Sequence, residues 1–153
     1  MGGNDKQALL GRGIQSLIGR VASVGEAIGI AFVTDDFATG LGAFALFDGD
    51  PAIDDEELFF SPDAWAWSTE KPFEEFNACW EAERPKSGPV AVAELFALLT
   101  VACDELGMQS EERYLAFFGV DPADYVVDAE SRFVERFNSA EVHERWKKLM
   151  SPG

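Results

Sequence analysis

The fold is decided by residues 28–67, which read IGIAFVTDDFATGLGAFALFDGDPAIDDEELFFSPDAWAW. Two short apolar runs, residues 28–34 and 42–47, are separated by polar, glycine-containing sequence, which is typical of strands buried on at least one face. We expect them to pair as an antiparallel hairpin with a loop around residues 35–40. The following residues, 48–57, combine glycine and proline with carboxylates and indicate an exposed loop. The centre of a sheet and an acidic loop are therefore expected side by side.

The elements around this hairpin follow from apolar periodicity. Residues 6–24 carry apolar side chains at helical spacing, and Gly25 is placed to end that helix. Short apolar runs predict further strands at residues 58–60 and 114–120, while residues 64–67 begin an ordered piece of undecided type. A further helix is predicted to start at Pro72 and to end before Pro85. A central buried helix is predicted over residues 90–106, with Gly107 as its cap. Two helices are expected at the end of the chain, and Ser139 is the N-cap of the second.

Length and composition predict one domain. The chain has 153 residues, of which 47% are hydrophobic, enough to fill a single core. The pattern of elements indicates an α+β fold, with a small, mostly antiparallel sheet of about three to five strands packed against several helices. We expect a single domain over residues 1–153, with residues 1–5 disordered and residues 150–153 as a tail.

The charge of the chain excludes some partners and favours others. Twelve Lys and Arg against 28 Asp and Glu give a formal net charge of −16. Such a surface repels nucleic acid phosphates and anionic lipid headgroups, so neither free nucleic acid nor a membrane surface is an expected partner. The same field would accelerate encounter with a basic protein. The alternative is that the acidity serves only solubility.

Cysteine usage and the beginning of the chain favour the cytoplasm. Cys79 and Cys103 both lie in predicted helices and are interpreted as buried free thiols, because their number and spacing support neither a disulfide framework nor a thiolate metal site. Residues 1–7 are polar and do not resemble a signal peptide. The apolar helix over residues 90–106 contains three carboxylates and falls short of a membrane span.

The negative charge is concentrated in one part of the chain. No Lys, Arg or His occurs between Val21 and Glu70, whereas this stretch contains eleven carboxylates. They are Glu26, Asp35, Asp36, Asp48, Asp50, Asp54, Asp55, Glu56, Glu57, Asp63 and Glu70. In an antiparallel hairpin the ends of the two strands point in opposite directions, so Asp35 and Asp36 would lie far from Asp48 and Asp50. Two acidic patches are expected, with a solvated surface as the simpler interpretation.

Other candidate sites are weaker. A helix-loop-helix calcium site from Asp48 is excluded, because Ala52 offers no oxygen ligand and Phe59 stands where a bidentate Glu is needed; a looser cation site stays open. His143, the only histidine, is predicted at the surface or at a boundary, since no pattern supplies a partner for it. A pairing of His143 with either cysteine has no positive support.

Trp65 and Trp67 are two positions apart, so on an extended segment both would face the same side. Core packing is the simpler interpretation of this pair. The alternative is a partly exposed anchor, because tryptophan is over-represented at binding hot spots.

One family resemblance covers most of the chain from Ile28 onward. The order of elements, the run Phe60-Ser61-Pro62-Asp63-Ala64-Trp65, the aromatic and acidic helix after it, and the ending Arg132-Phe133-Val134-Glu135-Arg136-Phe137-Asn138-Ser139 resemble the bacterial domain-of-unknown-function family 4303. The resemblance implies an α+β domain, and some relatives resemble immunity components of bacterial toxin systems. It supplies no catalytic residues, and the glycine-rich N-terminal region has no counterpart in it.

The leading hypothesis is a non-enzymatic cytoplasmic protein that binds a basic protein partner, as an immunity protein neutralises a cognate toxin. No catalytic residue, metal ligand or cofactor is assigned. The alternatives are a small metal-dependent hydrolase or transferase that uses the clustered carboxylates, and a self-associating structural or regulatory domain; the oligomeric state stays open. The candidate partner-binding residues are Asp48, Asp50, Asp54, Asp55, Glu56, Glu57, Asp63, Trp65 and Trp67.

Overall fold

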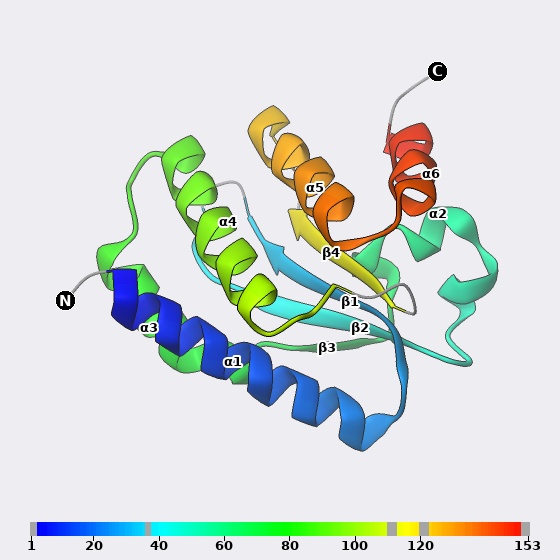
Figure 1. Cartoon of the computed structure of the whole chain (residues 1–153), viewed down its shortest axis with the longest axis horizontal. Coiled ribbons are helices and arrows are strands. Elements are labelled where there is room, and N and C mark those ends of the chain that lie inside the picture. Colours follow the sequence, from blue (N-terminus) through cyan, green and yellow to red (C-terminus); the bar gives the residue numbers. More distant parts are fainter. Residues whose placement is uncertain (1–2, 36–37, 110–112, 120–122, 151–153) are drawn as a thin grey trace.

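A four-stranded mixed sheet with helices on both faces forms the centre of the molecule (Figure 1). The computed structural model describes residues 3–35, 38–109, 113–119 and 123–150. The sheet has the strand order β3-β2-β1-β4, with β1 (Ala27–Thr34), β2 (Gly42–Phe47), β3 (Trp67–Thr69) and β4 (Tyr114–Gly119). The predicted α+β class and the mostly antiparallel sheet are confirmed, since two of the three strand pairs are antiparallel.

The predicted hairpin is the middle of this sheet. Strands β1 and β2 pair antiparallel, from Ala27 opposite Phe47 to Val33 opposite Gly42. Strand β4, predicted over residues 114–120, pairs parallel with the other edge of β1; residue 120 lies outside the described part of the chain. With neighbours on both sides and helices above and below, β1 is apolar from Ala27 to Val33, as a strand covered on both faces requires.

Helices α1 (Gly3–Val24), α3 (Glu74–Glu83) and α4 (Gly88–Glu105) cover the first face of the sheet. A short 3₁₀ helix, η3 (Lys71–Phe73), leads into α3. Helix α1 approaches this turn closely: a Cβ atom on Gly13 would lie 2.8 Å from both Phe73 Cδ1 and Pro72 O, so only glycine fits there. The layer is filled by Leu10, Ile14 and Leu17 of α1, Phe76 and Trp80 of α3, Leu95 and Leu99 of α4, and Ile30 and Phe32 of β1.

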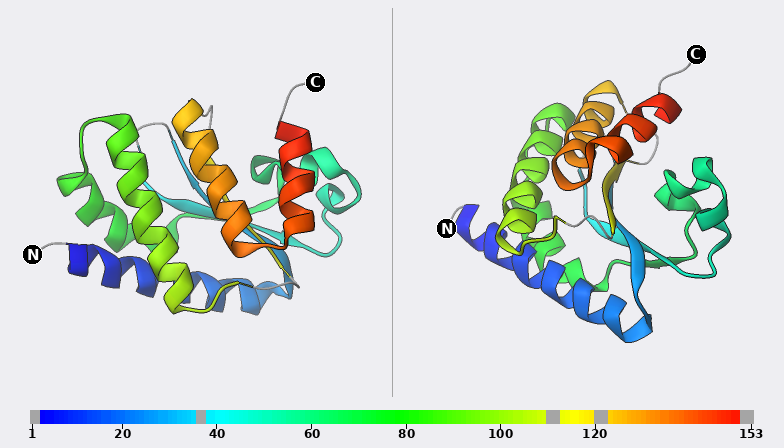
Figure 2. Two further views of the ribbon diagram at one scale, coloured as in Figure 1. Left: turned by 45° about the horizontal axis from the view of Figure 1, so that its top comes forward. Right: turned by 45° about the vertical axis from the view of Figure 1, so that its right-hand side comes forward.

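Two separate pieces cover the second face. One is a run of short helical turns, η1 (Pro51–Asp54), α2 (Glu56–Phe59) and η2 (Pro62–Ala64), and the other is α6 (Ala140–Met150). Figure 2 shows the short turns on the side of the sheet opposite to α4. The second layer consists of Ala31, Leu46, Tyr114 and Ala116 of the sheet beneath Phe60, Trp65, Val134 and Trp146.

Helix α5 (Asp124–Phe137) lies along the free edge of β4 and contributes to both layers, with Phe133 in the first and Val134 in the second. Just after α5, the Asn138 side chain accepts the Leu115 N–H at 2.9 Å and donates to the Leu115 carbonyl at 2.7 Å. Glu130 Oε1 accepts the Gly119 N–H at 2.8 Å. Polar side chains thus form hydrogen bonds with backbone groups at the free edge of β4, which could otherwise pair with another strand.

The ends of the other helices follow the sequence signals. The final helix has Ser139 as its N-cap, with the Val142 N–H 3.2 Å from Ser139 Oγ, as predicted. Gly107 follows α4 with φ +63, the left-handed cap that was expected. Helix α3 ends at Glu83, before Pro85. None of the helices in the described part of the chain is both long and apolar enough to cross a membrane.

Two expectations are wrong. Residues 58–60 are not a strand: they belong to α2 and its end, because the Asp55 side chain accepts the Glu57 and Leu58 N–H groups and starts a helical turn. The third strand is β3 instead. Helix α4 is the buried helix that was predicted, although Val90 and Val101 are exposed on its outer side. Residues 3–5, expected to be disordered, are the first residues of α1, and α6 continues through Met150.

Candidate functional site

The acidic segment, residues 48–63, runs over one end of the second face. Three of its carboxylates bind within the protein. Asp50 accepts the backbone N–H groups of Ala52 and Ala66, each at 3.0 Å. Asp55 caps α2, and Glu56 lies 3.3 Å from Arg145 Nε of α6. These three side chains hold the segment in place.

The other carboxylates of this segment face solvent. Asp48, Asp54, Glu57 and Asp63 are exposed. Within the described ranges their carboxylates accept no hydrogen bond and form no ion pair. The structure therefore divides the seven predicted acidic site residues into three that build the segment and four that are available to a partner.

The two tryptophans lie in different layers. Trp65 is 3% exposed, and its indole N–H donates to the Leu58 carbonyl at 3.2 Å. Its ring covers Gly29, where a Cβ atom would lie 3.0 Å from Trp65 Cη2. Trp67 is half-buried against Phe47, with 5.9 Å between ring centroids, and packs on the first layer. The expectation that both face one side is wrong because Trp65 precedes β3 and closes the turn η2. Trp65 is no exposed anchor.

A pocket of about 380 Å³ opens beside the acidic segment and is called here the Glu130 pocket. Residues 60–63, β4, α5 and α6 form its walls. Phe60, Tyr114 and Trp146 supply aromatic surface, and Asp63 and Glu130 are the charged residues that line it. The pocket is thus largely apolar, with a few polar groups directed into it, which is the usual character of a small-molecule site.

Glu130 is the unusual group of this pocket. It is 5% exposed, and its backbone partner, the Gly119 N–H, reaches only Oε1. Burial raises the pKa of Glu130 to about 7, although the hydrogen bond from Gly119 opposes the shift. Oε2 has no hydrogen-bond partner among the residues that the structure describes. The Glu130 carboxyl group therefore changes protonation near neutral pH while facing the pocket.

Tyr114 stands beside this carboxyl group. Burial raises the pKa of Tyr114 far above its ordinary value, and the charge of Glu130 raises it further. Its ring is edge-on to Phe60, with 5.2 Å between centroids, and to Trp65, with 6.3 Å. The phenol stays neutral, and a rigid aromatic cluster fixes its position.

The sequence interpretation missed Glu130, although a signal was present. Positions 126, 129, 133, 134 and 137 form the buried face of α5, and position 130 falls within the same stripe at helical spacing. A carboxylate on the apolar face of an amphipathic helix is rarely buried without a reason. The direction of that face is readable from the sequence alone, but the pocket that it meets is not.

His143 is buried, at 8% exposure, instead of lying at the surface or at a boundary. Its Nε2 is 3.1 Å from Ser131 Oγ, and its Nδ1 is 3.6 Å from a Glu135 carboxylate oxygen. The contacts from Ser131 to His143 and from His143 to Glu135 resemble a catalytic triad, in which a nucleophile, a base and an orienting carboxylate follow one another. Ser131 lies inside α5, however, where the helix uses its backbone N–H, and it is not among the described residues that line the Glu130 pocket. The arrangement joins α5 to α6.

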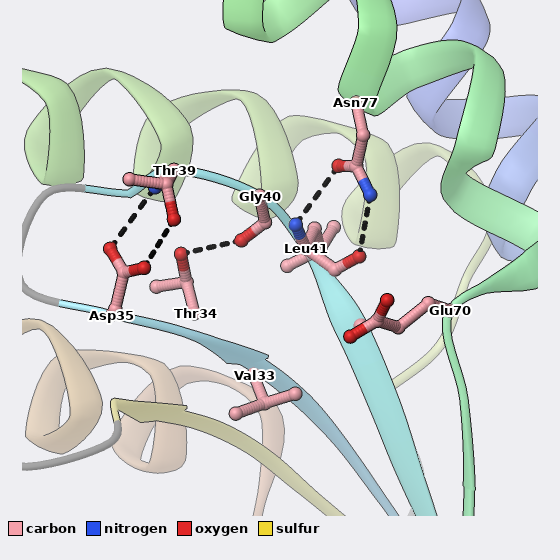
Figure 3. A pocket seen from close by; sticks show the side chains of 9 residues that line it. Val33, Thr34, Asp35, Thr39, Gly40, Leu41, Glu70 and Asn77 are labelled. Atoms are coloured by element: carbon pink, nitrogen blue, oxygen red, sulfur yellow. Dashed lines mark hydrogen bonds between the residues drawn. The ribbon is translucent and has the colours of Figure 1, made fainter.

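A second pocket, of about 350 Å³, lies at the opposite end of the hairpin (Figure 3). The Asp35 carboxylate accepts both the N–H and the hydroxyl of Thr39, and the Thr34 hydroxyl donates to the Gly40 carbonyl at 2.7 Å. Asn77 makes two hydrogen bonds to the backbone of Leu41. These side chains serve the loop itself, so the pocket offers little to a ligand.

The predicted separation of the acidic residues is confirmed. Asp35 and Glu70 line this second pocket, whereas Asp48 and Asp50 follow β2 at the other end of the pairing. Asp36 lies outside the described residues. Across residues 3–35, 38–109, 113–119 and 123–150, no group of three Asp, Glu, His or Cys residues could hold a metal ion.

The two cysteines are free thiols in α3 and α4. Burial raises the pKa of Cys103 to about 12. The Cys79 thiol donates to Glu83, and that hydrogen bond raises the pKa of the thiol. Neither sulfur has the lowered pKa of a nucleophile.

No family model, no curated protein and no solved structure matches this chain. The resemblance to domain-of-unknown-function family 4303 accordingly stays a prediction. A function for this protein has to be inferred from its own surface and pockets.

Proposed function

We propose that this protein is a non-enzymatic binding protein that takes up a basic protein partner on the exposed carboxylates of the acidic segment. The observation that carries the proposal is the division within that segment. Asp50, Asp55 and Glu56 fix the backbone, and Asp48, Asp54, Glu57 and Asp63 stay exposed and without a partner among the described residues.

Electrostatics supports such a partner. The chain has a formal charge of −16, and the acidic segment itself carries seven carboxylates and no Lys, Arg or His, so its surface is negative. Complementary charge accelerates encounter and weakens with salt, because ions screen exposed charges over about 10 Å at 0.1 M salt. The resemblance adds a biological role: the partner would be a toxin that this protein neutralises.

The metal-dependent alternative has less support. Two of the clustered carboxylates, Asp50 and Asp55, are occupied by backbone N–H groups, and a third, Glu56, is paired with Arg145. These groups are not convergent oxygens awaiting a cation.

The test uses two variants of equal charge. One carries Asp48→Asn, Asp54→Asn, Glu57→Gln and Asp63→Asn; the other carries Glu26→Gln, Glu74→Gln, Glu81→Gln and Glu105→Gln, all exposed and outside the acidic segment. Each protein is used to capture partners from the native host, and the association rate with any captured basic protein is measured against salt.

We expect the first variant to lose capture and most of the salt-dependent association rate, and the second to keep both. Equal binding by the two variants would show that only net charge matters and would overturn the assigned surface. Co-expression with the captured protein then tests neutralisation, and undiminished toxicity would refute the immunity role.

A further inference from the structure

The Glu130 pocket has the size of a small-ligand site. Its volume of about 380 Å³ lies between residues 60–63 and the three consecutive elements β4, α5 and α6. Asp63, at the end of the acidic segment, is exposed and lines it, so the pocket communicates with solvent on the acidic side of the molecule. A ligand of this size would be a small molecule.

The charged side chains that line the pocket favour a ligand of positive charge. Among the described residues, the charged side chains that line the pocket are Asp63 and Glu130; both are acidic, and no basic residue of these ranges lines it. The nearby Arg145 lies over the Phe60 ring, 5.4 Å from its centroid, and pairs with Glu56 instead of with Glu130. An anionic ligand would be repelled, whereas a cation would find an unpaired carboxylate oxygen, Oε2 of Glu130.

The aromatic walls favour an organic cation over a metal ion. Tyr114 and Trp146 present ring surface to the same pocket. An ammonium group close to an aromatic face is attracted by the ring quadrupole, and its carbon atoms gain from apolar contact. A hard metal ion would need several more oxygen ligands than this pocket provides.

Glu130 does more than the fold requires. The Gly119 N–H needs one acceptor, which the amide oxygen of glutamine would supply equally well. A buried carboxylate without a cation is unfavourable for folding, because burial opposes its charge. The negative charge at this position is explained if a cationic ligand uses it.

We propose that the Glu130 pocket binds a small alkylammonium ion, with the ammonium group paired to Glu130 and its carbon atoms against Tyr114 and Trp146. The proposal does not depend on the basic protein partner: the two sites share Asp63, but the cation is assigned to the buried carboxylate of Glu130, which is not one of the exposed carboxylates proposed for the partner.

Calorimetry on the full chain at about pH 8 tests the proposal with probes that differ only in charge. Butylammonium and choline are compared with 1-butanol, with 3,3-dimethyl-1-butanol, which is the neutral analogue of choline, and with butyrate. We expect the cations to bind at least about tenfold more tightly than their neutral analogues, and butyrate not to bind. Equal affinity for charged and neutral probes, or no binding of either cation at millimolar concentration, would overturn the proposal.

Two variants locate the site. Glu130→Gln keeps an acceptor for Gly119 and should lower cation affinity about tenfold or more, while Glu141→Gln, an exposed change on α6, should leave it unchanged. Retained affinity in Glu130→Gln would place the cation elsewhere. Circular dichroism confirms that both variants are folded.

Lowering the pH gives an independent readout. The pKa of Glu130 is near 7, so cation affinity should fall as the pH drops through 7 and the carboxyl group becomes neutral. In the part of the chain that the structure describes, the other titratable groups that line the pocket are Tyr114 of β4 and Asp63, and α6 contributes Trp146 and Met150, which do not titrate. An affinity that is constant between about pH 8 and pH 5.5 would contradict the role of Glu130.

Discussion

The two faces of the sheet are built from the same strands but are closed in different ways. On the first face, long helices place fully buried aromatic and aliphatic side chains against Ile30 and Phe32. On the second face, short turns and α6 meet over small residues such as Ala31 and Ala116, and they leave a pocket with a buried carboxyl group. This difference predicts that the first face contributes more to stability, while the second face holds the pocket that we propose binds a ligand.

The largest loss of stability is expected from the replacement of a buried phenylalanine, and two of them can be compared to test this difference between the faces. Phe133 touches the rings of Phe32, Phe96, Phe117 and Phe137, whereas Phe60 forms a wall of the pocket. We expect Phe133→Ala to lower the free energy of unfolding by about 3–5 kcal/mol, and Phe60→Ala by less, because solvent can enter the space next to the pocket. Urea denaturation measures both, and equal losses would remove the contrast.

The next test concerns the charge on Glu130. The folded pKa of about 7 lies above the ordinary 4.5, so the folded state holds a proton that the unfolded chain has already released. The free energy of unfolding should therefore fall as the pH rises from 4.5 to about 7 and then level off. Glu130→Gln should remove this decline and be more stable than the parent by up to about 3 kcal/mol above pH 7.

The measurement is denaturation of parent and variant at about pH 5 and pH 8, with Asp128→Asn as an exposed control on the same helix. A Glu130→Gln variant that is less stable than the parent at pH 8 would show that the carboxylate stabilises the fold. The unfavourable burial invoked for the pocket would then be wrong.

A smaller effect is expected at the β4 edge. Asn138→Ala leaves the Leu115 N–H and carbonyl without their side-chain partner, and should lower the free energy of unfolding by about 1–3 kcal/mol. Hydrogen exchange at Leu115 should accelerate more than at residues of β2. Unchanged protection would show that the edge is closed without this side chain.

The smallest effects separate neighbouring carboxylates of the acidic segment. Asp55→Ala removes the N-cap of α2 and should cost about 1 kcal/mol, while Asp54→Ala, at an exposed position, should change stability by less than about 0.5 kcal/mol. Thermal denaturation of the two variants compares them directly. Equal shifts would mean that the division into structural and available carboxylates does not hold.

Much of the fold could be predicted because its signals are local. The β1–β2 hairpin, helix α1 and the Ser139 cap each follow from apolar spacing or from a cap within a few residues. Residues 58–60 were misassigned because an apolar run of three residues is compatible with either a strand or a helical turn, and the Asp55 side chain decides for the turn. The site was predicted in part: the acidic segment is at the surface, but Trp65 is in the core.

The sequence by itself determined the sign of the charge, the central hairpin and the separation of the two acidic patches, since each depends on residues close together in the chain. Only the tertiary structure decided that β4 joins β1 in parallel, that Trp65 and Trp67 enter opposite layers, and that Glu130 faces Tyr114 and Trp146. These features depend on contacts between segments many residues apart. Because hydrophobic attraction is non-directional, the apolar pattern of one segment does not specify which other segment it packs against.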